Sequence, residues 1–117
     1  GEQSLVEKTR PLLDAVSDRF FHLGPPGSGA RMKLVFNLML GLERAALAEA
    51  LAFAKALRID PNVALDVLQA GATSCPAMQS KGPKMIRGEY PPEARLAQHL
   101  KDVELILKQA EPRNAKV

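Results

Sequence analysis

The sequence predicts an all-α protein, a helical bundle built on one long central helix of about residues 28–57. After a glycine-rich turn at residues 24–29, no proline interrupts the chain up to Leu57. This stretch is rich in Ala and Leu, which are strong helix formers. Its apolar residues also occupy nearly every side of the expected helix, so we expect it to be buried on most faces.

The segment before this helix is expected to contain one helix and one extended stretch. Residues 2–17 have an apolar helical period, and Ser4 and Glu7 have capping-box spacing. Pro11 is unfavourable in a helix interior, so the helix either begins or kinks there. Residues 19–23 are short, aromatic and bounded by Gly24, which favours a strand. His22 within it is interpreted as a structural histidine, not a ligand.

Three further helical segments are expected downstream. Asp60 followed by Pro61 is a favoured helix start, and Gly71 a favoured stop, so a helix is predicted between them. Residues 71–92 are rich in turn residues and predict only short helical turns, at 77–82 and 84–87, with Ser74 as an N-cap. A last helix is expected over about 92–110, packed near the start of the long helix. Its apolar side consists of Leu96, Leu100, Val103 and Leu107.

Composition limits the classes of function. Hydrophobic residues make up 46% and charged residues 25% of the 117 residues, as in ordinary globular proteins. The net charge of +3 is scattered along the chain, so nucleic-acid binding is not expected. Charges within the long helix argue against a membrane span. Cys75 is the single cysteine, which excludes an internal disulfide, gives no basis for a metal site and favours the cytoplasm.

The informative residues of the long helix are its polar exceptions. Lys33 and Asn37 lie four residues apart and therefore project from one face, and Gly41 continues that row. A lysine and an amide would be costly to bury without partners. One interpretation is a surface lysine beside an unremarkable asparagine; the other is a functional pair.

The glycines, the lysine and the asparagine together resemble a family signature. The pattern Gly24-x-x-Gly27-x-Gly29-x-x-x-Lys33-x-x-x-Asn37 is similar to that of the β-hydroxyacid dehydrogenases, the 3-hydroxyisobutyrate dehydrogenase-like group. The resemblance implies the C-terminal helical domain of that group, similar to the 6-phosphogluconate dehydrogenase C-terminal domain-like fold. It implies Lys33 as catalytic acid/base and Asn37 as substrate-binding residue. The spacing does not match a P-loop, in which glycine and lysine are adjacent.

A second segment carries the resemblance into the last helix. Lys101-Asp102-Val103 resembles the family's Lys-Asp-Leu, whose lysine reaches the cofactor, so Lys101 is the expected residue for binding NAD or NADP. Two positions depart from the family pattern. Ala94 stands where phenylalanine is usual, which puts local packing over the active site in doubt. Arg58 stands where glycine is common, so the link after the long helix is expected to have a different shape.

The resemblance also implies a domain organisation. Residues 1–24 are expected to be the end of a truncated N-terminal dinucleotide-binding domain, a helix–strand remnant of a Rossmann domain. Residues 25–117 are expected to be the helical C-terminal dehydrogenase domain, also truncated at its C-terminus. No Gly-x-Gly-x-x-Gly follows a strand here, so the dinucleotide-binding half is missing and the isolated chain is expected to be inactive.

Two functions from different classes remain open. The first is part of an NAD(P)-dependent oxidoreductase acting on a small 3-hydroxy acid, similar to 3-hydroxyisobutyrate or 2-hydroxy-3-oxopropionate, with Lys33 as proton donor and acceptor. The second is a non-catalytic helical dimerisation module on the same fold. In both cases a homodimer through the long helix is expected, because its apolar surface is large.

Overall fold

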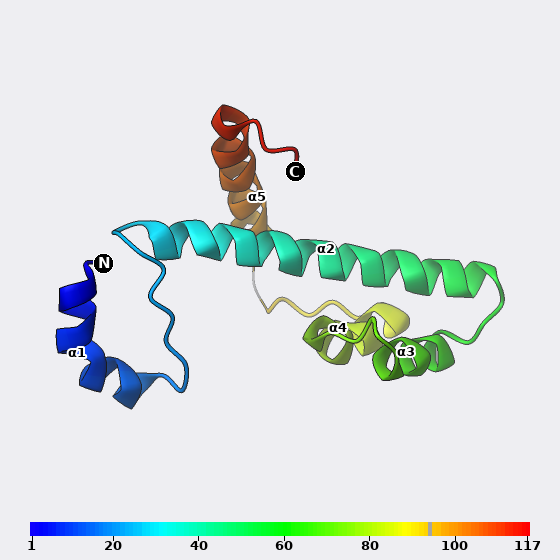
Figure 1. Ribbon diagram of the computed structural model, residues 1–117. Coiled ribbons are helices and arrows are strands. Elements are labelled where there is room, and N and C mark those ends of the chain that lie inside the picture. The colour runs from blue at the N-terminus through cyan, green and yellow to red at the C-terminus, as the bar shows by residue number, and fades with distance from the viewer. Residues whose placement is uncertain (94) are drawn as a thin grey trace. The chain divides into compact units, whose positions relative to one another are not determined.

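The computed structural model describes residues 1–93 and 95–117, and the secondary structure in these ranges is entirely helical (Figure 1). The predicted all-α class is therefore confirmed. Two compact units are formed by Gly1–Phe36 and Asn37–Val117, and the long helix runs through both. The elements in order are α1 (Gln3–Val16), α2 (Ser28–Ala56), α3 (Pro61–Ala70), α4 (Pro76–Arg87), α5 (Leu96–Ala110) and the short 3-10 helix η1 (Glu111–Arg113).

The first unit begins with α1, which includes Pro11 instead of starting there. The strand expected over residues 19–23 is not formed: these residues are extended coil, and no strand occurs in the described parts of the chain. A strand needs a neighbour for its backbone hydrogen bonds, and none is present. The segment instead contacts the start of the chain, where the carbonyl of Gly1 lies 2.8 Å from His22 Nε2. His22 thus has a structural contact, as expected.

The glycine-rich turn leads directly into α2. Gly24 and Gly27 have φ values of 102° and 91°, a region that side chains strongly disfavour. The carbonyl of Gly27 then accepts from the Arg31 N–H at 3.0 Å, which closes the first helical turn. The predicted long helix of about 28–57 is confirmed almost to the residue.

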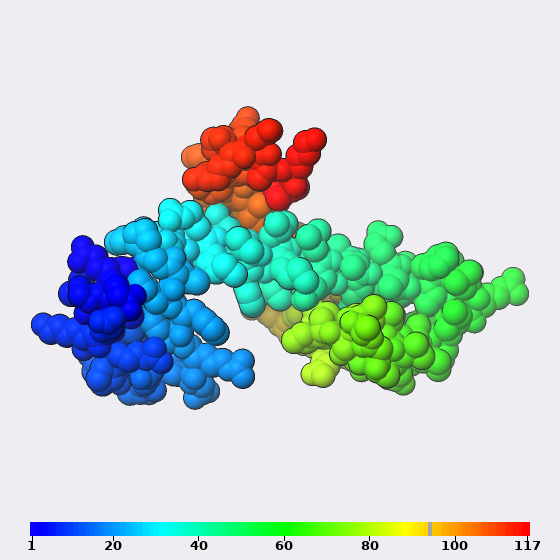
Figure 2. Space-filling view, in the orientation of Figure 1, coloured from blue at the N-terminus to red at the C-terminus, as the bar shows by residue number. Residues whose placement is uncertain are grey.

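The core of the second unit joins α2, α3 and α4. Leu47 and Leu51 of α2 pack with Leu65 of α3 and Met78 of α4, and Leu47 is only 1% exposed. Burying one such side chain contributes about 1.5–3 kcal/mol. In the space-filling view, α3 and α4 lie against the second half of α2 (Figure 2).

The prediction that α2 is buried on most faces is wrong for this chain. Only Leu47, Leu51 and Ala54 are buried, a single stripe at helical spacing. On another side, Met39 is 57%, Leu42 58% and Phe53 65% exposed. An Ala/Leu-rich composition establishes a helix, but the neighbouring elements decide how many of its faces are covered.

Helix ends follow their local signals in two places. Asp60 accepts from the Asn62 N–H at 2.7 Å and caps α3, as predicted. That hydrogen bond also lowers the pKa of Asp60. At the end of α2, Arg58 has a φ of 61°, and the Ile59 N–H bonds back to the Ala54 carbonyl at 2.9 Å. Arg58 therefore adopts the left-handed conformation that favours glycine, so the expected change of shape in this link is not required.

The turn-rich region forms one helix where two short stretches were expected. α4 continues through Pro83, and Gly82 lies buried in its interior. The Ser74 cap is also wrong, because Cys75 is the N-cap residue and makes no side-chain cap. Pro76 at the first helical position supplies the start that the prediction assigned to Ser74. Gly88 ends the helix with a φ of 68°.

The last helix begins at Leu96, about one turn later than expected, and Ile106 is its buried residue. The predicted apolar side is exposed: the exposed fraction is 82% for Leu96, 56% for Leu100, 51% for Leu107 and 38% for Val103. The prediction that Ala94 alters the local packing over the active site concerns a residue outside those that the structure describes. Among the helices described, none is long and apolar enough to cross a membrane.

Candidate functional site

The candidate site lies in the second unit, where α2 and α5 meet. On α2, the side chains of Asn37 and Arg44 and the backbone of Gly41 occupy one face, because their spacing of four and three residues matches the helical repeat. They line a pocket of about 500 Å³. Its lining is completed by Leu40 and by Arg95, Leu96, Gln98, His99 and Asp102 from the start of α5.

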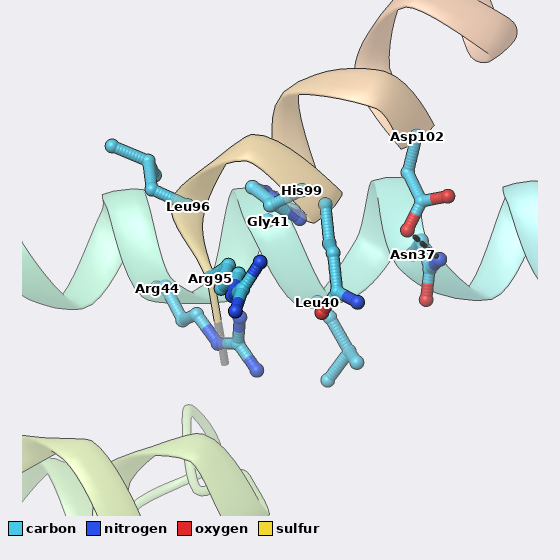
Figure 3. A pocket seen from close by; sticks show the side chains of 9 residues that line it. Asn37, Leu40, Gly41, Arg44, Arg95, Leu96, His99 and Asp102 are labelled. Carbon is cyan, nitrogen blue, oxygen red and sulfur yellow. Dashed lines mark hydrogen bonds between the residues drawn. The ribbon is translucent and has the colours of Figure 1, made fainter. Parts of the chain in front are cut away.

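One end of the pocket is fixed by a hydrogen bond between the two helices. The Asn37 amide nitrogen donates to Asp102 Oδ2 at 2.8 Å, and both residues are partly buried (Figure 3). A hydrogen bond to an ionised carboxylate is stronger than one between neutral groups. It joins the two segments on which the family resemblance rests. The last helix was expected near the start of the long one, but it meets α2 nearer its middle, from Asn37 to Arg44.

In the middle of the pocket the imidazole of His99 lies against α2 at Gly41. A Cβ added at Gly41 would lie 3.4 Å from His99 Nε2 and 3.5 Å from Cε1, at the short end of ordinary van der Waals contact. From Asn37 to Gly41 the chain runs towards the C-terminus of α2. The residues that they contact, Asp102 and then His99, run towards the N-terminus of α5.

The other end of the pocket is basic. Arg44 follows Gly41 by three residues on α2, and Arg95 precedes His99 by four residues at the start of α5. Both side chains line the pocket, and Figure 3 shows them at the end away from the Asn37–Asp102 hydrogen bond. Arg44 Nε is buried and has no hydrogen-bond partner within the described residues. A buried donor without an acceptor is costly. The Nε itself is closed to solvent, so it is the rest of the Arg44 side chain that lines the pocket.

The predicted site residues are only partly brought together. Asn37 lines the pocket, whereas Lys33 and Lys101 do not belong to its described lining. Lys33 is exposed and lies in the first unit, one helical turn before Asn37 along α2. Lys101 is exposed on α5 beside Asp102.

Sequence reasoning missed Arg44, Arg95 and His99 as pocket residues. A signal for Arg44 was present, since it lies seven residues after Asn37 and therefore on the same helical face. Arg95 and His99 have the same spacing before Asp102. Nothing in the sequence, however, shows that these two faces meet.

The described residues provide little for a metal ion or a whole dinucleotide. Within 1–93 and 95–117, no group of three or more His, Cys, Asp and Glu side chains is placed to hold a metal. For NAD or NADP, the exposed ammonium of Lys101 is chemically suited to pair with an anionic or carbonyl group of the cofactor. A single ammonium group is not a complete cofactor site.

Comparison with known proteins agrees with the sequence motifs. The family described as NAD-binding of NADP-dependent 3-hydroxyisobutyrate dehydrogenase matches residues 27–117. Glyoxylate/succinic semialdehyde reductase 2, chloroplastic, of Arabidopsis thaliana is 40% identical over 95% of this chain and 31% of its own length. The cytokine-like nuclear factor N-PAC of Aedes aegypti is 33% identical over 95% of this chain and 20% of its own length.

A solved structure extends the similarity to three dimensions. The crystal structure of 3-hydroxyisobutyrate dehydrogenase from Salmonella typhimurium superposes on the whole chain with a TM-score of 0.87 at 26% identity, and 41% of that protein is covered. The chain thus spans about a third of the length of the reductase and less than half of the dehydrogenase. The family match covers more than half of the chain, including the segment from Gly27 through Asn37 to Asp102. The chain therefore belongs to the family of NAD-binding domains of NADP-dependent 3-hydroxyisobutyrate dehydrogenases.

Proposed function

We propose that the protein is an NAD(P)-dependent oxidoreductase acting on a small hydroxy acid, and that this chain supplies its helical, substrate-positioning part. The observation that carries the proposal is the Asn37–Asp102 hydrogen bond, which joins the two motif segments at a pocket. Membership of the dehydrogenase family supports it. In this proposal residues 1–24 belong to the dinucleotide-binding domain and residues 25–117 to the helical domain.

Lys33 is proposed as the proton donor and acceptor. Oxidation of an alcohol needs a base for the hydroxyl proton, and reduction of a carbonyl needs an acid for the oxygen. A lysine performs both roles when its surroundings bring its pKa towards neutrality. Its place on a long, regular helix gives Lys33 a rigid support.

Asn37 is proposed to orient the substrate. Its amide has two N–H donors and one carbonyl acceptor, and the bond to Asp102 uses one donor. That bond fixes the amide plane, so the second donor and the carbonyl oxygen stay available for a hydroxyl or carboxylate in the pocket. Asp102 is thereby a positioning residue for Asn37.

Lys101 is proposed to bind the cofactor. The cofactor supplies the hydride acceptor or donor, while the protein must supply binding, orientation and proton transfer. The exposed ammonium of Lys101 provides attraction for an anionic cofactor. Replacing Lys101 by Ala should raise the KM for NAD(P)H, with an effect on rate that shrinks at saturating cofactor.

The substrate class is tested with the complete protein that carries this chain. We propose a small 3-hydroxy acid similar to 3-hydroxyisobutyrate or 2-hydroxy-3-oxopropionate. Glyoxylate and succinic semialdehyde are tested as further substrates, because both occur in the name of the Arabidopsis relative. Absorbance of NADH and NADPH is followed with each acid in both directions. Turnover that is lowered in both kcat and kcat/KM by Asn37→Ala supports the proposal, and absence of turnover with every acid would oppose it.

A second candidate is a helical dimerisation module without catalysis. It is favoured by the exposed apolar face of α2, where Met39, Leu42 and Phe53 lie at spacings of three and eleven residues and so project to similar directions. A relative named as a nuclear factor, not as an enzyme, also supports this alternative. Both candidates include a homodimer through α2, since apolar patches of this kind mark interfaces.

The dimer is tested by sedimentation at micromolar concentrations. Phe53→Lys places a charge on the apolar face and should shift the protein towards monomer. Ala52→Lys, at the exposed neighbouring position and about 100° around the helix, is the matched control and should leave association unchanged. A wild-type protein that stays monomeric at high micromolar concentration would contradict the proposed dimer.

A cytoplasmic location is part of the proposal. Its basis is the single, half-buried cysteine Cys75 and a composition without apolar spans. The named location of the Arabidopsis reductase is the chloroplast, so organelles are the competing location. Cell fractionation with an antibody against the protein decides between them.

A further inference from the structure

We propose that the basic end of the pocket between α2 and α5 is a binding site for a carboxylate or phosphate group, held by the guanidinium groups of Arg44 and Arg95. Both arginines line the pocket at the end away from the Asn37–Asp102 hydrogen bond (Figure 3). The proposal concerns the second unit alone. It does not depend on the catalytic role proposed for Lys33.

The first argument is the unsatisfied donor of Arg44. Arg44 Nε is buried and lacks a partner within the described residues. A guanidinium is always charged, so it cannot remove this cost by losing a proton. Removing a donor from water without giving it an acceptor costs free energy, and a turn of the Arg44 side chain that brings Nε to an acceptor in the pocket would recover that cost.

The second argument is that the carboxylates lining the two pockets to which Arg44 belongs already accept hydrogen bonds. Arg44 also lines a neighbouring pocket that contains Glu93, but the two oxygens of Glu93 accept from Lys81 and Lys84. At the other end of its own pocket, Asp102 accepts from Asn37. The lining thus holds two guanidinium groups against the one carboxylate of Asp102, an excess of positive charge.

The third argument is the position of the start of α5. Arg95 is the N-cap residue of this 15-residue helix and makes no side-chain hydrogen bond to the first turn. Leu96, the first helical residue, lines the pocket. The N-terminal end of a helix carries partial positive charge and attracts anions, which adds to the two guanidinium groups.

These features specify the ligand chemistry. A guanidinium offers parallel N–H donors that match the two oxygens of a carboxylate or phosphate. The pocket volume of about 500 Å³ exceeds what a single ion needs, so a small organic acid or phosphate ester also has room. Succinate and inorganic phosphate are therefore the two probes, and they distinguish a carboxylate source from a phosphate source.

The experiment is an NMR titration of the ¹⁵N-labelled protein with each probe. Arginine Nε–Hε signals are followed, with the Arg44 signal assigned by its loss in Arg44→Met. Saturable shifts of that signal are expected with at least one probe, and Arg44→Met and Arg95→Met should each weaken binding about tenfold or more. Arg113→Met removes an equal charge outside the pocket and should change the affinity less than twofold.

The outcomes separate the two sources and test the site. Tighter binding of phosphate identifies a phosphate site, and tighter binding of succinate a carboxylate site. If Arg44→Met does not fold, as judged by circular dichroism, the exposed Arg95 carries the test. Equal losses in Arg113→Met, or no saturable shift with either probe, would overturn the proposal. The titration measures anion binding without turnover, so failure of the proposed catalysis and failure of this site are distinguishable.

Discussion

Replacing Gly82 by Ala tests the packing between α3 and α4 on which the second unit depends. An added Cβ at Gly82 would lie 2.7 Å from both Cδ atoms of Leu65. Optimal carbon–carbon separations are about 3.5–4.0 Å, so these contacts are too short by roughly an ångström. Leu65 is 6% exposed and packs in the core with Leu47, Leu51 and Met78, so its side chain has no open space to move into.

Two opposing effects decide the size of the change. Alanine is favoured over glycine by about 1 kcal/mol in a helix interior. Overpacking a dense core costs about 1–3 kcal/mol, and the upper half of that range applies because both methyl groups are met at once. The net expectation is a loss of about 1–2 kcal/mol, or about 4–15 °C in Tm for a unit of this size.

The assay is urea unfolding followed by circular dichroism at 222 nm. Gly29→Ala is the matched control, since Gly29 is also helical but a Cβ there meets nothing within 4 Å. It should be neutral or slightly stabilising. In a Leu65→Ala background the two methyl groups are gone, and Gly82→Ala should then no longer destabilise. Stabilisation by Gly82→Ala comparable to that of the control would refute the packing argument.

Three further predictions follow from single contacts. Asp60→Ala should lower Tm because the Asn62 N–H loses its acceptor, whereas Asp60→Asn should largely retain it; equal losses would contradict the cap. Arg58→Gly should raise stability by up to about 1 kcal/mol in urea unfolding, since the φ of 61° strains a side chain; a loss would contradict that strain. Hydrogen bonds from Lys81 and Lys84 lower the pKa of Glu93 from 4.5 to about 2, so the stability contributed by this cluster is present above pH 4.5 and is lost as the pH falls towards 2. Carboxyl ¹³C NMR should show that low pKa, and Lys81→Met should raise it; a Glu93 that titrates near 4.5 would contradict the cluster.

Local signals in the sequence predicted most helix boundaries. Asp60, Pro61 and Gly71 mark both ends of α3, and the unbroken Ala/Leu segment marks α2, because caps and propensities act within a few residues. The continuity of α4 through Pro83 was not predicted. Packing of Gly82 against Leu65 of α3 accompanies that continuity, and no local signal in the sequence reports such a contact.

Of the candidate site, too, only a part was predicted from the sequence. The family signature led to Asn37 and to the segment containing Asp102, and the structure joins the two by a hydrogen bond. Arg44 and Arg95 were not predicted, since their importance arises from the register between α2 and α5. That register depends on contacts between residues far apart in the sequence, such as Asn37 and Asp102, which are 65 positions apart. The helical period within either segment gives no information about such contacts.

The central claim is that Lys33 transfers the proton, and steady-state kinetics of Lys33→Ala and Lys33→Arg in the complete protein test it most directly. General acid–base catalysis contributes about 10²–10⁴-fold, so Lys33→Ala should lower kcat by that factor with little change in the KM of the acid. Lys33→Arg should not restore the rate, because a guanidinium keeps its proton near neutral pH. A Lys33→Arg enzyme with near wild-type kcat would contradict the claim and leave Lys33 as a fixed positive charge only.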